Sequence, residues 1–144
     1  MLKLLVPVSH STRSLQAVRH AAFLYNEGCA SEVVLINVLP PLGPTRVEAF
    51  YSLATLRANE ESYAEATFSR AKRILEDAGV KYSVEVREGP LVPTIADCAE
   101  QHDCDEIVVT APRRDLFHAV ARLVHRSVLD RLVSVSRVPV TAVN

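Results

Sequence analysis

The chain has 144 residues, of which 49% are hydrophobic and 23% are charged. This length allows one buried core and excludes two ordinary domains, and the apolar content excludes intrinsic disorder. With 16 basic and 17 acidic residues the net charge is -1, so the overall charge does not favour nucleic acid or an anionic membrane as a partner. We therefore predict a single domain over residues 1–144 that binds neither.

The sequence shows no targeting signal and no cysteine pattern that indicates a function. No apolar run approaches the roughly 18 residues that a membrane-spanning helix needs, and the first eight residues lack the long apolar core of a secretory signal. We therefore expect a cytoplasmic protein. Cys29, Cys98 and Cys104 show no metal-binding spacing, so they are interpreted as structural thiols and no metal site is predicted.

Five short apolar runs have the length and composition of strands. In chain order they cover residues 2–8, 32–39, 81–87, 106–110 and 138–143. Apolar residues are continuous at 4–6, 33–36 and 107–109, which is typical of parallel strands that are covered on both faces. Residues 82–87 alternate between polar and apolar, so this strand is expected near an edge of the sheet.

Helical patterns lie between the runs. The first begins at Ser11 as N-cap, ends at Gly28, and has an apolar stripe through Leu15, Val18, Ala22 and Tyr25. The second covers residues 58–78, with a stripe through Tyr63, Ala66, Arg70, Ile74 and Leu75. The third follows Gly89 and Pro90, and the fourth covers residues 116–134.

The order of these elements is βαβαβαβαβ, which predicts an α/β, doubly wound parallel sheet of five strands with helices on both faces. In such sheets ligands bind beyond the carboxyl ends of the strands, where the winding direction reverses. The candidate site is therefore formed by the loops after the first and fourth strands, residues 9–12 and 111–115. The long connection over residues 40–57 is either a lid over this site or a variable surface loop.

Several segments resemble the universal stress protein family. Val6-Pro7-Val8-Ser9-His10-Ser11 resembles the family's V-P-V-D-G-S opening, and Asp105 to Val109 resembles its fourth strand. Ser127-Val128 followed by Val138-Pro139-Val140 resembles its G-S-V and C-P-V ending. The similarity runs along nearly the whole chain, and it implies a Rossmann-like, adenine nucleotide alpha hydrolase-like fold with strand order 3-2-1-4-5.

The resemblance also implies a homodimer in which the last strands of two subunits pair antiparallel. Val138, Val140 and Ala142 would line that edge. An open edge on a short, uncharged strand independently favours such pairing. The alternative is a monomer whose edge is blunted by Pro139, which lacks a backbone donor.

ATP-binding members of the family carry a G-x-x-G-(9)-G-S loop after the fourth strand, whose backbone N–H groups approach the phosphates. Here Thr110, Arg113 and Arg126 stand at the glycine positions. Ser9 stands where the family has an aspartate, whereas Val8, Val38 and Ser127 keep the pattern. The resemblance is therefore to the branch that lacks the ATP loop, which implies a non-enzymatic stress-response binding or signalling protein with no cofactor.

An alternative function is anion binding by a group of arginine side chains. Arg113, Arg114 and Arg126, with Thr110 and Ser127 beside them, would form an anion site made of side chains, and the ligand would be ATP, AMP or another anion. The same arginines also fit a solvated helix face that turns Leu116, Val120, Leu132 and their apolar neighbours toward the sheet.

A catalytic role has little support in the sequence. Ser9, His10 and Ser11 occupy the candidate site without a nucleophile elbow or a paired carboxylate, so Ser11 is expected to cap the helix and His10 to lie at the surface. An ATP hydrolase would need Asp115 to bind a metal ion. We expect no enzymatic activity.

Overall fold

The computed structural model describes residues 1–9, 11–39, 53–111 and 127–144, with the backbone alone described over residues 53–64. The elements are β1 (Leu2–Pro7), the 3-10 turn η1 (Thr12–Ser14), α1 (Leu15–Asn26), β2 (Ala30–Leu39), α2 (Leu53–Asp77), β3 (Tyr82–Glu88), α3 (Leu91–Gln101), β4 (Glu106–Thr110), α5 (Val128–Val135) and β5 (Val140–Val143). Strands and helices alternate as predicted.

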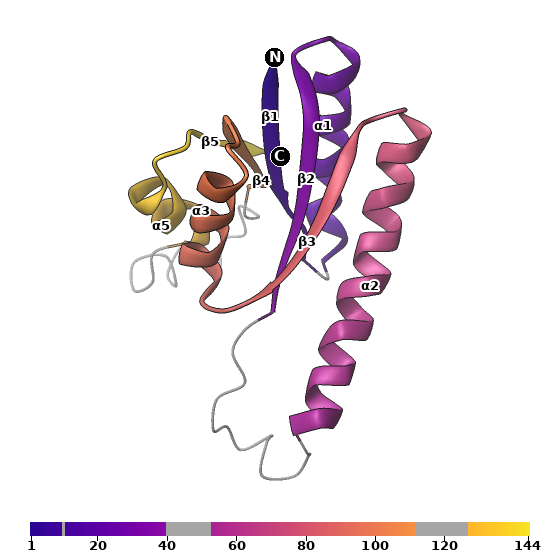
Figure 1. Cartoon of the computed structure of the whole chain (residues 1–144), viewed down its shortest axis with the longest axis vertical. Helices are drawn as coiled ribbons and strands as arrows, with labels where there is room; N and C mark the ends of the chain where they lie inside the picture. The colour runs from indigo at the N-terminus through magenta and orange to yellow at the C-terminus, as the bar shows by residue number, and fades with distance from the viewer. Residues whose placement is uncertain (10, 40–52, 112–126) are drawn as a thin grey trace.

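The five strands form one parallel sheet in the order β3-β2-β1-β4-β5. Helices α1 and α2 cover one face, and α3 and α5 cover the other (Figure 1). The predicted doubly wound architecture is thus confirmed. The winding direction reverses between β1 and β4, which are neighbours in the sheet although β2 and β3 separate them in the sequence.

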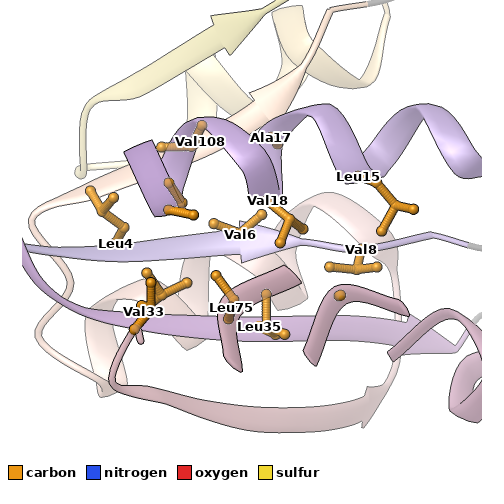
Figure 2. Packing of buried hydrophobic residues seen from close by; sticks show 14 of the residues in the cluster. Leu4, Val6, Val8, Leu15, Ala17, Val18, Val33, Leu35, Leu75 and Val108 are labelled. Atoms are coloured by element: carbon orange, nitrogen blue, oxygen red, sulfur yellow. The ribbon is translucent and has the colours of Figure 1, made fainter. Parts of the chain in front are cut away.

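The first half of the core lies between the sheet and helices α1 and α2. Alternate residues of β1 and β2 point into it, because successive side chains of a strand face opposite sides of a sheet. Figure 2 shows these side chains packed against Leu15 and Val18 of α1 and Leu75 of α2. All three helix residues are buried, and they hold α1 and α2 against the strands.

The second half of the core packs α3 and α5 against the opposite face. It contains Leu5, Ile107, Ile95 and Leu132 together with the thiols of Cys98 and Cys104. Burial raises the pKa of Cys104 to about 11, so this thiol stays protonated and behaves as a small apolar group. The structural interpretation holds for these two cysteines, but Cys29 is exposed.

Three helix predictions need correction. The first segment opens with η1 before α1, although Ser11 is the N-cap as predicted and its Oγ accepts the N–H of Arg13. Helix α2 begins at Leu53, inside the predicted loop 40–57, and the rest of that loop, residues 40–52, lies outside the described residues. The predicted stripe of α2 is only partly correct. Leu75 is buried and Ile74 packs against the core as predicted, whereas Ala66 and Arg70 are exposed. Thr67, Phe68 and Ala71 are buried in their place.

The predicted helix over residues 116–134 is not continuous through Ser127. The backbone of Ser127 is extended, with φ -63° and ψ 158°, and its Oγ accepts the N–H of Asp130 at 3.2 Å. This capping geometry satisfies a free N–H in the first turn, and α5 starts at Val128. Leu132 faces the sheet as predicted, whereas Leu116 and Val120 lie outside the described part of the chain.

The last strand begins at Val140, two residues later than predicted, so Val138 lies outside it. The N–H of Val138 donates to Ser136 Oγ at 3.0 Å, and that hydroxyl donates to the carbonyl of Val138 at 2.8 Å. The carbonyls of Pro139 and Val143 accept N–H groups of Ile107 and Ala111 on the β4 side. The backbone groups of residues 140 and 142 therefore point away from β4, and the missing donor of Pro139 does not blunt the outer edge.

An ion-pair cluster ties the edge strand β3 to the end of α3. His102 Nε2 lies 2.8 Å from Glu85 Oε1, and Arg87 Nε donates to Glu85 Oε2 at 3.4 Å. Burial by itself would raise the pKa of Glu85, but hydrogen bonds from His102 and Arg87 outweigh it and hold the pKa below its usual value. The ionised form of Glu85 is therefore stabilised by folding.

Acid titration should reveal this contribution. Because the folded pKa of Glu85 is lowered, its stabilising effect is complete above the ordinary glutamate pKa of about 4.3 and is lost as the pH falls through the folded value. We expect Glu85→Gln to lower the free energy of unfolding by about 1 kcal/mol or less at pH 6, and by less at pH 3, in urea titrations. Asp97→Asn, at an exposed position of α3, is the control; a loss at pH 3 equal to that at pH 6 would contradict the assignment.

Candidate functional site

The candidate site is a cavity of about 300 Å³ at the carboxyl ends of β1, β2 and β4. It lies at the point where the winding direction reverses, as the sequence analysis predicts. Pro7, Val8 and Ser9 reach it from β1, Ile36 to Val38 from β2, and Val109 to Ala111 from β4. Its volume is at the lower end of the range for small-molecule sites, which is roughly 300 to 1,000 Å³.

Apolar side chains, chiefly branched aliphatic ones, form most of the cavity wall. Helix α3 contributes Leu91 and Ile95, α5 contributes Val128, and β2 contributes Val38. Leu91 and Val128 are more than 40% exposed, although both are large apolar residues. Exposed apolar groups at the wall of a cavity are favourable contacts for a flat apolar ligand group.

Thr110, which stands at the first glycine position, is used by the fold itself. Its Oγ1 donates to the carbonyl of Arg13 at 2.9 Å and accepts the N–H of Ala17 at 3.2 Å. The hydroxyl thus bridges two backbone groups at the start of α1 and joins β4 to that helix. Thr110 lines the cavity, but the proton of its hydroxyl is already donated to the protein.

Most of the polar residues that line the cavity belong to the loop after β1. Arg13 Nη2 donates to the carbonyl of Ala111 at 2.9 Å, which links the loops after β1 and β4. The Ser14 hydroxyl lies 3.1 Å from the carbonyl of Ser9 and 2.7 Å from that of Ser11, both of which can accept its proton. Ser9 Oγ accepts the N–H of Ser11 at 3.3 Å. Arg13 is the only charged side chain among the described residues that line the cavity.

Ser127 belongs to a second, smaller cavity of about 200 Å³ between the end of β4 and α5. Its hydroxyl donates to Asp130 Oδ2 at 2.7 Å and accepts the N–H of the same residue. Ser127 is therefore a helix cap in this structure. Val109, Thr110 and Val128 line both cavities, so the two lie side by side.

The structure brings only some of the predicted site residues together. Val8, Ser9, Val38 and Thr110 line the main cavity, and Ser127 lines the smaller one. Arg113, Arg114, Arg126, His10 and Asp115 lie outside the described residues.

Arg13 and Asn37 also line the cavity but were not predicted as site residues. Asn37 is 9% exposed at the end of β2 and lines the same cavity, where a polar residue interrupts an apolar strand. That interruption is the signal that could have identified it. No local pattern marks Arg13, because its contact with Ala111 spans 98 residues.

The described residues contain neither a metal-binding cluster nor a membrane-spanning helix. No three His, Cys, Asp or Glu residues in that part of the chain are grouped so that they could hold a metal ion. Among the described helices, none has the length and apolar character needed to cross a membrane.

Comparisons with known proteins agree on one family. The model of the universal stress protein family matches residues 1–144. A universal stress protein of Methanocaldococcus jannaschii is 27% identical over 143 residues, covering 98% of this chain and 81% of the relative.

Two solved structures illustrate the shared fold. A universal stress protein in complex with cAMP superposes with a TM-score of 0.76 at 18% identity, covering 99% of this chain and 97% of the other. The universal stress protein from Archaeoglobus fulgidus in complex with dAMP gives a TM-score of 0.66 at 22% identity, covering 100% and 98%.

Proposed function

Because the chain belongs to the universal stress protein family, we propose that it is a non-enzymatic binding protein for an adenine nucleoside or its monophosphate, acting in stress response or signalling. The observation that carries this proposal is the small, mostly aliphatic cavity at the carboxyl ends of β1, β2 and β4. Solved neighbours with the same fold are complexes with cAMP and dAMP. The cytoplasmic location expected from the sequence stays a prediction.

The cavity offers an adenine nucleoside two kinds of contact, apolar and polar. Val38, Leu91 and Val128 provide branched apolar groups for the faces of a planar ring. Most of the polar lining groups belong to the β1 loop, and they can meet the ribose or a phosphate. A lining that is mostly apolar with a few polar groups suits a nucleoside.

A triphosphate is a less suitable ligand. The sequence has no glycine after Gly89, so no backbone cradle of the G-x-x-G type can form after β4. At the first glycine position, the Thr110 hydroxyl already donates its proton to Arg13. The alternative anion site at Arg113, Arg114 and Arg126 stays a prediction.

The absence of catalysis is part of the proposal. Ser9, Ser11 and Ser14 are the hydroxyl groups beside Arg13, and their hydrogen bonds in the described structure go to backbone atoms. A serine nucleophile needs a base within hydrogen-bond reach, and none of these bonds supplies one.

We also propose that the protein is a homodimer joined through β5. The backbone groups of Val140 and Ala142 point away from β4, and β5 is the last strand of the sheet. An unpaired strand edge is a template for pairing with another strand, and a two-fold axis closes such a pair without leaving a further edge.

The ligand proposal predicts a specific thermal response. A ligand that binds only the folded state stabilises it by about 2.7 kcal/mol at one hundred times its dissociation constant. We expect adenosine and AMP to raise the midpoint of thermal unfolding saturably, and ATP to raise it no more than AMP, with or without magnesium. The protein should first be refolded from denaturant so that no copurified ligand fills the cavity.

A cavity-filling variant provides the control. Ala111 follows Ile107 and Val109 at alternate positions, so its side chain points toward the α3 and α5 face, where the cavity lies. Ala111→Phe should therefore abolish the response to adenosine, whereas Ala66→Phe on the exposed face of α2 should not. No saturable shift with any nucleoside, from a folded protein, would contradict the proposed ligand.

A further inference from the structure

Arg13 is held in place before any ligand arrives. Its guanidinium donates to the carbonyl of Ala111 at 2.9 Å, and its own carbonyl accepts the Thr110 hydroxyl at 2.9 Å. The residue is half-buried and lines the main cavity. A side chain that is already ordered loses little conformational entropy on binding, which favours affinity.

Among the described residues, Ala111 is the only one to which the guanidinium of Arg13 donates. Arginine has five N–H donors, and the bond to Ala111 uses one of them. In the described part of the chain, no carboxylate pairs with Arg13, and none lines the cavity. The remaining donors have the planar geometry that matches two oxygens of a phosphate.

Two serine hydroxyls beside Arg13 are also available as donors. Ser9 Oγ accepts the N–H of Ser11, and Ser11 Oγ accepts the N–H of Arg13, both at 3.3 Å. Within the described residues each hydroxyl acts only as an acceptor, so its own proton can be donated to a ligand. Ser14 differs, because its hydroxyl donates to backbone carbonyls.

The charge of this loop favours an anion. Arg13 is the only charged residue among the described residues of this loop, so the described part of the loop is cationic. A single positive charge facing a small, largely apolar cavity is less screened than the same charge in water.

We propose that Arg13, with the hydroxyls of Ser9 and Ser11, binds the single phosphate of the ligand, so that the anionic group lies on the loop after β1. This inference rests on the proposed function and narrows it to nucleoside monophosphates. One guanidinium and two hydroxyls match one phosphate group, whereas a chain of three phosphates would need further donors.

The test compares AMP with adenosine, which differ only in the phosphate. Isothermal titration should show AMP binding roughly tenfold to a hundredfold more tightly than adenosine, because hydrogen bonds to charged groups contribute about 1.5 to 3 kcal/mol. Arg13→Gln should reduce that ratio to about one, and Arg13→Lys should retain part of it. Arg19→Gln, at an exposed position of the following helix α1, is the matched control and should leave the ratio unchanged.

The outcomes separate this inference from the proposed function. If Arg13→Gln keeps the wild-type preference for AMP, the phosphate site is wrong although the nucleoside site stands. If neither AMP nor adenosine binds the wild type, the proposed function fails. Titration with inorganic phosphate then tests the anion site by itself. Phosphate binding that Arg13→Gln removes supports the anion site, and any other result overturns it. Should Arg13→Gln not fold, Ser9→Asp provides the second variant, because its added carboxylate should remove the preference for AMP.

Discussion

Replacement of Leu132 by alanine is expected to lower the free energy of unfolding by about 2 to 5 kcal/mol. Leu132 is fully buried, and it is the only residue of α5 that is. Helix α5 has eight residues, which is too short to be stable without packing. The loss of this one side chain therefore removes most of what holds the helix against the sheet.

The smaller cavity increases the expected loss. Leu132 lines this cavity of about 200 Å³, so its truncation enlarges an existing space. The cost of such substitutions rises with the volume that stays empty, which places the effect in the upper half of the range. Val128 of the same helix lines the ligand cavity, and we expect weaker nucleoside binding as well.

Val133→Ala is the matched control for this prediction. Val133 follows Leu132 directly but is 58% exposed, so its truncation should change stability by less than about 0.5 kcal/mol. Urea unfolding of the two variants measures the difference. Equal losses would mean that α5 is not anchored by Leu132.

The fold could be predicted from the sequence because the burial of each strand is reflected in its pattern of apolar residues. The continuous apolar runs at 4–6 and 33–36 belong to β1 and β2 in the interior of the sheet, and the alternating run at 82–87 belongs to the edge strand β3. Glycines 28 and 79 follow α1 and α2 with φ of +74° and +70°, as expected of helix terminators. The strand order itself came from the family resemblance.

The candidate site was predicted less completely, because its chemistry depends on contacts between distant residues. The position of the cavity follows from the topology, and four predicted residues line it. The roles of Thr110 and Arg13 depend on hydrogen bonds between the end of β4 and the start of α1, more than 90 residues apart. A motif comparison registers only that a glycine is missing at position 110, whereas the structure shows that its replacement joins two elements.

The substitution Ala142→Pro is expected to convert the proposed homodimer into monomers. Ala142 is exposed on β5, and its N–H points away from β4. Proline would remove that donor from the outer edge and leave the hydrogen bonds between β4 and β5 intact. A substitution at Val140 would be harder to interpret, because its side chain packs against the core between the sheet and α3 and α5.

Sedimentation velocity measures the result directly, as a halving of the mass. Ala142→Ser keeps the N–H and should remain a dimer, which distinguishes loss of the backbone donor from a change of side chain. For a folded dimer the midpoint of thermal unfolding rises with protein concentration, and Ala142→Pro should lose this dependence because its unfolding no longer includes dissociation. If Ala142→Pro is folded and retains the mass of the wild-type dimer, the subunits do not associate through this edge.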